Sequence, residues 1–268
     1  MDDFYYKNQN GVVTLHCRAL DNIPQLRHCF TTRKGGISVG HLSSMNLSFS
    51  REERSTVEEN YHRLCKSEGF TMPRMTLTDQ THTDTVRLVD EQTAGMGMSK
   101  TSNIFDTDGL ITCLPDTPLA VFVADCAPVL MYDRISGAIA AVHSGWRGTQ
   151  KGIAARALEQ MAERFGTRPE NVIAAVGPCI CKCCYEVGED FKEQWQNPED
   201  NSLFEAGKQG KYYFDLKQAN ARVLEKAGVG EIYVSKECTC CKSDLLFSHR
   251  ATKGKRGNMA GIIQIVQK

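Results

Sequence analysis

Apolar residues gather in short runs along much of the chain, and most of these runs are bounded by glycine, aspartate, serine or proline. Such runs are typical of β-strands. We expect strands at residues 11–15, 75–78, 85–89, 110–112, 119–124, 129–132, 138–142, 172–176, 231–234 and 261–266. The run at 119–124 is apolar almost throughout, which indicates a strand that is buried on both faces.

Other segments carry the period of an α-helix. In the first of them, Val57, Tyr61 and Leu64 recur on one face. Ser55 and Glu58 have the spacing of a capping box, in which each side chain bonds a free backbone N–H of the first turn. This pattern predicts a helix that begins next to Ser55.

Two further helices are predicted over residues 149–165 and 216–226. Gly166 follows the first and is suited to the left-handed conformation that ends many helices, and Asp215 precedes the second as a good N-cap. Because strands and helices alternate, the pattern predicts a layered α/β domain with a mixed sheet. No repeat, low-complexity segment or linker divides the chain, so we expect a single domain over residues 1–268.

The composition is that of a globular protein, with 41% hydrophobic and 24% charged residues. The chain has 32 basic and 32 acidic residues, so it has no overall field to attract nucleic acid or an anionic membrane. It contains no apolar run of about 18 residues, and its first residues lack a basic region followed by an apolar stretch, so we expect no signal peptide. We therefore expect a cytoplasmic protein, a monomer or homodimer, that acts on small molecules.

The polar chemistry is concentrated where predicted strands end. His82 follows one strand, Cys126 follows the buried strand at 119–124, and His143 ends the strand at 138–142. Two imidazoles and one thiolate suit zinc and leave its fourth tetrahedral position open for a reactant. The three residues lie far apart in sequence, however, so spacing alone also allows two hydrogen-bonded structural histidines and a core cysteine.

Several longer motifs resemble one known family. They are Ala-Asp-Cys-Ala-Pro at 124–128, His-Ser-Gly-Trp-Arg-Gly at 143–148, Gly-Pro-Cys-Ile at 177–180 and Cys-Tyr-Glu-Val-Gly at 184–188, with shorter matches at 31–38, 46–47, 106–110 and 247–250. In consistent order and over nearly the whole chain, they resemble the YfiH family. Its members are also called laccase-domain or multicopper polyphenol oxidase proteins and are now regarded as purine nucleoside phosphorylases.

The resemblance implies a fold, a metal site and a reaction. The fold is a single layered αββα domain with mixed β-sheets, of the α/β (α+β) class and related to cytotoxic necrotizing factor. The residues that match the family's catalytic zinc ligands are His82, Cys126 and His143. The implied reaction is phosphorolysis of adenosine, inosine and methylthioadenosine, together with deamination of adenosine.

The sequence departs from the family pattern at two positions near the site. Members often have Gly or Ser after the first zinc histidine, where this chain has Thr83. An aromatic residue normally precedes the late arginine, where this chain has His249. We expect the first change to narrow the mouth of the site and the second to alter substrate preference.

Four polar residues are candidates for contacts with phosphate or nucleoside. Arg33, Arg147 and Arg250 lie in matching motifs, and a guanidinium offers phosphate two parallel hydrogen bonds. Arg33 also lies in a glycine-rich turn whose backbone N–H groups suit an anion. Asn46 is a candidate to bond ribose or base. The alternative for each arginine is a solvated surface position. Replacing Arg147 by alanine is expected to lower the rate about 10²–10³-fold.

Three other functions compete with the phosphorylase. A His₂Cys blue-copper centre is compatible with the three ligands. A multicopper oxidase also needs a histidine-rich copper cluster, and seven histidines in all are too few. In a metal-free hydrolase, Cys126 is the nucleophile and His143 its base, which leaves His82 without a role. The third competitor is a protein that edits peptidoglycan precursors.

Seven of the 12 cysteines lie in two tight groups, 179–184 and 238–241. They suggest either a second zinc or iron–sulfur site, or thiols that are tolerated near the rim of the active site. Metal-binding pairs normally have the spacing Cys-x₂₋₄-Cys with turn geometry, and these groups are more crowded. The spacing therefore favours tolerated thiols, and a Cys181→Ser, Cys240→Ser double variant is expected to keep its fold and its metal content.

Overall fold

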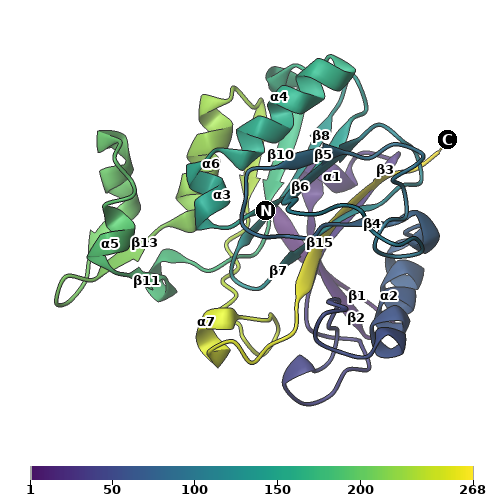
Figure 1. Ribbon diagram of the computed structural model, residues 1–268, viewed down its shortest axis with the longest axis horizontal. Coiled ribbons are helices and arrows are strands. Elements are labelled where there is room, and N and C mark those ends of the chain that lie inside the picture. The colour runs from purple at the N-terminus through teal and green to yellow at the C-terminus, as the bar shows by residue number, and fades with distance from the viewer. Residues whose placement is uncertain (1, 268) are drawn as a thin grey trace.

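Two six-stranded sheets lie face to face between outer layers of helices in the computed structural model, which describes residues 2–267 (Figure 1). The first sheet has the order β1-β2-β3-β15-β7-β4 and the second β14-β10-β8-β9-β6-β5. The strands of the first sheet are β1 (Phe4–Gln9), β2 (Val12–Cys17), β3 (Leu26–Thr31), β4 (Thr76–Leu77), β7 (Leu119–Val123) and β15 (Met259–Ile265). Those of the second are β5 (Val86–Leu88), β6 (Gly109–Thr112), β8 (Ala127–Asp133), β9 (Ile139–Ser144), β10 (Val172–Val176) and β14 (Glu231–Val234).

The helices are α1 (Arg18–Asp21), α2 (Arg54–Glu68), α3 (Trp146–Gln150), α4 (Ile153–Phe165), α5 (Glu189–Lys192), α6 (Leu216–Lys226) and α7 (His249–Thr252). Helices α2, α4 and α6 pack on the outer faces of the two sheets, whereas Leu20 of α1 packs between them. Buried residues of α2 share one core cluster with the first sheet, and buried residues of α4 and α6 share another with the second. The predicted layered αββα fold is confirmed. Every helix within residues 2–267 is too short or too polar to span a bilayer.

The central strands are buried on both faces, because each side of a sheet meets another layer. In β8, Val129 and Met131 pack toward α4, whereas Leu130 and Tyr132 pack between the two sheets. Strand β7 shows the same division, as its apolar sequence predicts. This double burial makes the strand ends rigid, and the polar motifs leave the sheets at these ends.

Two helix predictions need correction. The helix predicted over 149–165 is two helices, α3 and α4, separated at Gly152, which adopts a left-handed conformation with φ of 75°. A left-handed residue cannot continue a right-handed helix. Helix α2 begins at Arg54, before the predicted capping box, and Ser55 lies inside its first turn. The third prediction is confirmed, because Asp215 accepts a hydrogen bond from the Gln218 backbone N–H at the start of α6.

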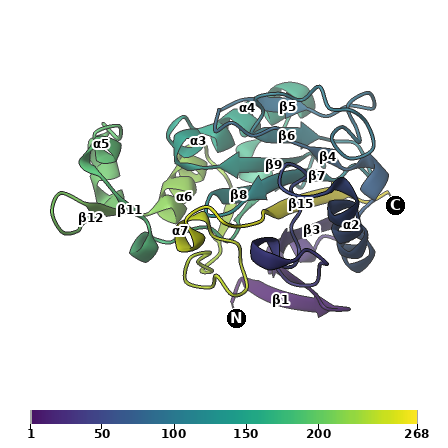
Figure 2. The ribbon, with the colours of Figure 1, turned by 60° about the horizontal axis from the view of Figure 1, so that its bottom comes forward.

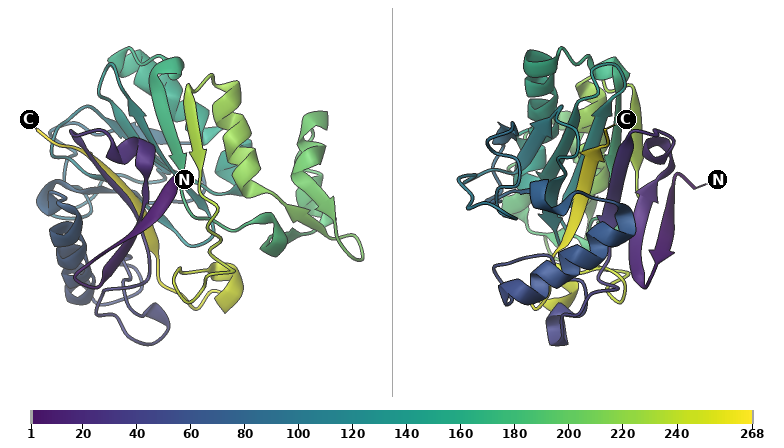
Figure 3. Two further views of the ribbon diagram at one scale, coloured as in Figure 1. Left: turned by 180° about the vertical axis from the view of Figure 1, so that it is seen from behind. Right: turned by 90° about the vertical axis from the view of Figure 1, so that its right-hand side faces the viewer.

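The apolar pattern missed strands that carry polar residues. Strand β1 lies at the free edge of the first sheet, where the purple hairpin β1–β2 is seen from behind in Figure 3, and its last residues are exposed. Strand β3 contains Arg27 and the fully buried His28. His28 is accommodated because its Nε2 accepts the Cys17 backbone N–H at 2.9 Å and its Nδ1 lies 3.4 Å from Asp21 Oδ1.

Residues 181–215 form an arm that projects from the sheets (Figures 1 and 2). The arm contains α5 and a third sheet of β11 (Glu186–Val187), β13 (Tyr212–Phe214) and β12 (Phe204–Ala206). Aromatic rings hold it together: Phe191 contacts Phe214 with ring centroids 5.1 Å apart, and Trp195 contacts Phe214 at 4.8 Å. That the whole chain forms one domain stays a prediction.

Candidate functional site

The fold brings together His82, Cys126 and His143, the three metal ligands predicted from the sequence. His82 follows β4, Cys126 lies directly before β8, and His143 is in β9. One potential ligand atom from each lies within 4.8 Å of the others. Cys126 Sγ is 3.9 Å from His82 Nε2, and the two imidazole rings cross at 80°. We call these residues the triad.

Asp108 fixes the positions of two triad residues through hydrogen bonds. Its side chain is completely buried, and it accepts a 2.6 Å hydrogen bond from His143 Nδ1. It also accepts the backbone N–H groups of His82 at 3.2 Å and Thr83 at 2.8 Å. One carboxylate therefore fixes the ring of one histidine and the backbone of another. The bond to Nδ1 leaves Nε2 of His143 available to a metal, an arrangement typical of metal-binding histidines.

Asp108, Cys126 and His143 stabilise one another's charged forms. Burial alone would raise the pKa of Asp108, but hydrogen bonds from His143 and Thr83 outweigh it and lower that pKa to about 2. Burial would likewise raise the pKa of Cys126, yet the neighbouring imidazoles lower it to about 6. Burial would lower the pKa of His143, and the charges of Cys126 and Asp108 raise it to about 9. Cys126 is thus held as a thiolate, the form that binds metals and attacks electrophiles.

The backbone around the triad adopts conformations that bring the side chains close. His82 and Asp125 have φ of 65° and 98°, in the left-handed region that non-glycine residues seldom occupy. The Asp125 carboxylate accepts hydrogen bonds of 2.6 Å from Thr239 Oγ1 and from the Arg250 backbone N–H. Gly145 lies against the triad, and a Cβ there would stand 2.9 Å from Cys126 Sγ. Only glycine leaves room for the thiolate.

Two cavities meet at the triad, one of about 430 Å³ and one of about 320 Å³. Both are the size of small-molecule sites. The first cavity combines Phe49 and Phe105 with polar side chains such as Gln80. The second has the rings of Trp146 and Tyr185 on its walls. His82, Cys126 and Arg256 line both cavities, so a ligand that spans them passes directly over the triad.

Arg256 is a half-buried cation at the junction of the two cavities. Its Nε is buried and has no hydrogen-bond partner among residues 2–267, and its Nη1 makes only a 3.4 Å contact with the Gly257 carbonyl. Burial, followed by the charge of Arg51, lowers its pKa. An unpaired guanidinium in such a place is suited to an anionic ligand.

The sequence of the chain matches a known family. Residues 27–266 match the model of the family described as multi-copper polyphenol oxidoreductase laccase. The chain belongs to this family. A purine nucleoside phosphorylase of Deinococcus radiodurans is 37% identical to it over 236 residues, which are 88% of each chain. The purine nucleoside phosphorylase YlmD of Geobacillus stearothermophilus is 33% identical over 240 residues, 87% of this chain and 88% of that one.

Solved structures of similar proteins share the fold. The crystal structure of YlmD from Geobacillus stearothermophilus superposes with a TM-score of 0.91 at 31% identity, and all of each chain is covered. That of YfiH from Bacillus licheniformis gives 0.90 at 30% identity, over 97% of this chain and 98% of that one. The resemblance to the YfiH family that the motifs indicate is confirmed.

Two of the four predicted substrate contacts lie beside the second cavity. Arg250 lines it, but its guanidinium donates hydrogen bonds to the backbone carbonyls of Cys184 at 3.3 Å and Glu186 at 3.0 Å. Arg147 is exposed, and its guanidinium lies 4.2 Å from the ring centroid of Trp146, on the cavity wall. Arg250 therefore ties the arm to the cavity, whereas Arg147 packs on the Trp146 ring and does not line the cavity.

The other two predicted contacts support the site from outside the cavities. Arg33 donates 2.8 Å hydrogen bonds to the carbonyls of Ser43 and Ser243, and its guanidinium covers the ring of Phe247. Asn46 is completely buried, and its side-chain oxygen accepts the backbone N–H groups of Ser48 and Asn258, which line the first cavity.

The two residues that depart from the family pattern, Thr83 and His249, occupy different places in the site. Thr83 turns its hydroxyl inward and donates a 2.8 Å hydrogen bond to Asp108, so it supports the triad from below. His249 lines the second cavity, where its imidazole can contact a substrate. Sequence reasoning missed Arg256, Asp108 and Tyr185 as site residues. Asp108 and Tyr185 lie in matching motifs and offered a signal, whereas Arg256 lies in a basic loop and offered none.

Proposed function

We propose that this protein is a zinc-dependent purine nucleoside phosphorylase. It would convert adenosine or inosine and phosphate into the free base and ribose 1-phosphate, and methylthioadenosine and phosphate into adenine and 5-methylthioribose 1-phosphate. The observation that carries the proposal is the meeting of two cavities at the triad, with the unpaired Arg256 between them. Support also comes from relatives named purine nucleoside phosphorylase that match this chain over most of its length.

The triad is suited to hold the zinc ion. Two imidazole nitrogens and a thiolate form a typical three-ligand catalytic set, and Asp108 orients one imidazole as a second-layer carboxylate. When bound, zinc would polarise an oxygen atom of a reactant in its open position. Copper oxidase chemistry has less support: within residues 2–267 the other candidate group that contains histidine is His16, Asp21 and His28, with only two imidazoles.

In this proposal Arg256 binds the phosphate and the aromatic rings bind the purine. Cleavage of the N-glycosidic bond needs phosphate beside C1′ of the ribose. Arg256 is placed to hold that phosphate, because its buried Nε has no hydrogen-bond partner among residues 2–267 and its side chain lines both cavities. The purine would lie in the second cavity against Trp146 and Tyr185, since flat aromatic walls favour stacking with a base. The protein would thereby align phosphate and ribose for attack.

Deamination of adenosine is a second activity that we include in the proposal. C1′ and C6 lie at opposite ends of a nucleoside, so one bound orientation cannot bring both to the triad. The two cavities flank the triad and allow two orientations. The thiolate character of Cys126 is also compatible with a metal-free Cys126–His143 hydrolase. That alternative leaves the exposed His82, 3.9 Å from the sulfur, without a function.

Product analysis tests the proposal. The purified protein is incubated with adenosine, inosine or methylthioadenosine and with phosphate, and the products are separated by chromatography. We expect free base from all three nucleosides. The sugar product should be ribose 1-phosphate from adenosine and inosine and 5-methylthioribose 1-phosphate from methylthioadenosine, and adenosine should also give ammonia with inosine. Nucleosides that remain intact under all conditions would contradict the proposal.

Replacing Asp108 by asparagine is expected to weaken zinc binding and lower activity, each about 10–100-fold. Asparagine has nearly the same shape, but it loses the negative charge that stabilises His143 and orients its ring. Competition with a chelator measures the affinity. Asp106→Asn is the matched control, because Asp106 is exposed and bonds Thr81 in the same loop. Equal zinc affinity in the two variants would contradict the role of Asp108 in zinc binding.

A further inference from the structure

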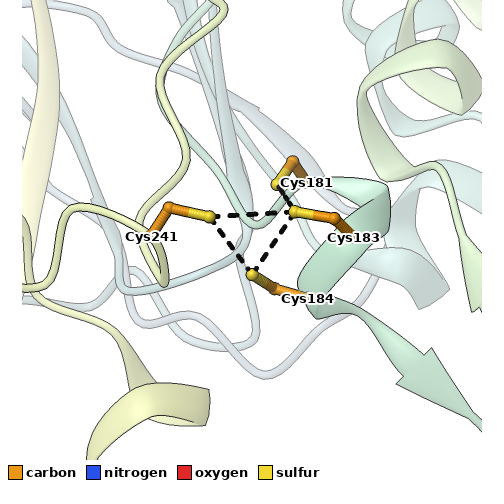
Figure 4. Close-up of side chains that lie close together, drawn as sticks. All are labelled: Cys181, Cys183, Cys184 and Cys241. Carbon is orange, nitrogen blue, oxygen red and sulfur yellow. Dashed lines mark hydrogen bonds between the residues drawn. The ribbon is translucent and has the colours of Figure 1, made fainter.

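Four cysteine thiols come together at the base of the projecting arm (Figure 4). Cys181, Cys183 and Cys184 belong to the turn that precedes β11, and Cys241 belongs to the loop between β14 and α7. All four sulfur atoms lie within 4.8 Å of one another. The shorter separations are 3.0 Å from Cys181 to Cys183, 3.3 Å from Cys184 to Cys241, 3.6 Å from Cys183 to Cys184 and 3.7 Å from Cys183 to Cys241.

Backbone contacts hold the two segments in this arrangement. Cys179 and Cys238 form a parallel β-bridge, and the Thr239 backbone N–H donates to the Cys179 carbonyl at 3.2 Å. The buried sulfur of Cys238 accepts the backbone N–H groups of Cys181 at 3.3 Å and of Cys241 at 3.4 Å. These backbone contacts join the two cysteine-bearing segments and thereby hold the four thiols close together.

We propose that Cys181, Cys183, Cys184 and Cys241 bind a second zinc ion, separate from the triad. Zinc binds thiolate sulfur at about 2.3 Å, so a tetrahedral set of four has sulfur atoms about 3.8 Å apart. The four shorter separations, 3.0 to 3.7 Å, lie somewhat below this value, no pair exceeds 4.8 Å, and all are longer than a disulfide bond of about 2.05 Å. Four protein ligands fill the coordination sphere, so the ion has a structural role and each thiol releases its proton to solvent.

The fold removes the objection raised by the crowded spacing. Cys181 and Cys184 are separated by two residues, which is a normal spacing for a zinc pair. Cys183 lies between them and still reaches the group, because the turn that carries them is a 3₁₀ helix. Cys241 completes the set from a loop 57 residues beyond Cys184. The geometry therefore reverses the expectation for the Cys181→Ser, Cys240→Ser double variant, which should lose this second ion.

The ion would fix a wall of the second cavity. Arg250 donates a hydrogen bond to the Cys184 carbonyl, and Tyr185, the next residue, lines that cavity with Arg250. Cys241 lies eight residues before His249, on the segment that leads into α7. A metal that joins Cys184 to Cys241 thus ties the base of the arm to the segment carrying the cavity's basic residues.

Metal analysis of the full chain, purified under reducing conditions without added metal, tests the proposal. We expect about two zinc ions per wild-type chain, about one in Cys241→Ser and about one in His82→Ala. Cys240→Ser is the matched control and should keep two, because Cys240 neighbours Cys241 but is outside the group of four. In His82→Ala, titration of the thiols with a mercurial reagent should release the remaining zinc, a measurement that leaves the four ligands unmutated.

The outcomes distinguish this site from the triad. One zinc that is kept in His82→Ala and lost in Cys241→Ser would support the second site and contradict zinc at the triad. Unchanged zinc in Cys241→Ser would overturn the proposal. A Cys184–Cys241 disulfide in freshly reduced protein, or iron together with inorganic sulfide, would overturn the assignment to zinc.

Discussion

Replacing Cys126 by alanine is expected to remove the zinc of the triad and to lower phosphorolysis about 10³-fold or more. Two imidazoles remain, and two ligands seldom hold zinc against solvent. The loss also removes the charge that raises the pKa of His143, so the remaining site is altered electrostatically as well. Elemental analysis and initial rates measure the two effects. Cys113→Ala is the control, since Cys113 is a half-buried thiol at the end of β6 that lines neither cavity.

A second substitution at the same position separates zinc chemistry from a cysteine nucleophile. Aspartate is a zinc ligand, but its carboxylate is a much weaker nucleophile than a thiolate. We expect Cys126→Asp to bind more zinc than Cys126→Ala and to recover part of the activity. If zinc returns in Cys126→Asp while activity stays at the level of Cys126→Ala, the metal-free hydrolase becomes the better account.

Replacing Arg256 by methionine is expected to lower kcat/KM for phosphate about 10²–10³-fold, the usual cost of losing a catalytic anion contact. Methionine keeps much of the length of the side chain and removes the unpaired charge between the cavities. Most of the loss should appear as a higher KM for phosphate, because the guanidinium binds phosphate before and during attack. Initial rates over a range of phosphate concentrations measure it.

Lys255→Met is the matched control for Arg256. Lys255 is the neighbouring cation, it is exposed, and it lines neither cavity. Its loss changes the net charge equally, so its rate should remain within a few-fold of the wild type. A loss of similar size in both variants would indicate a general electrostatic effect and would contradict the specific role of Arg256.

The triad was predictable because its motifs lie at strand ends. Burial on both faces makes β7 and β9 readable as apolar runs, and the residue that follows or ends such a strand is placed by a rigid sheet. The two histidines and Cys126 are also the residue types that zinc prefers. Chemistry and position therefore pointed to the same three residues.

Arg256 was not predictable in this way. It stands in the basic run 253–256, which has the pattern of a solvated loop. The loop places Arg256 where two cavities meet, and the walls of these cavities come from segments that are distant in sequence. Arg33 shows the opposite case: its motif suggested an anion site, but backbone carbonyls from Ser43 and Ser243 take up its donors. The hydrogen-bond partners of an arginine are set by tertiary structure.

The cysteine group shows the same limit. Sequence spacing within 179–184 and 238–241 gave no indication that Cys241 would meet Cys183 and Cys184, because the parallel bridge between Cys179 and Cys238 is a long-range contact. The division of helix 149–165 was a local error by comparison. Gly152 was visible in the sequence, and only its left-handed conformation shows that it separates α3 from α4.

The phosphate dependence of base release from inosine is the most direct test of the proposed function. Hypoxanthine and ribose 1-phosphate are measured together over a range of phosphate concentrations from zero upward. We predict that base release is negligible without phosphate, rises with its concentration and saturates, and that one ribose 1-phosphate forms for each base. Base released equally fast without phosphate, accompanied by free ribose, would contradict the account and identify a hydrolase.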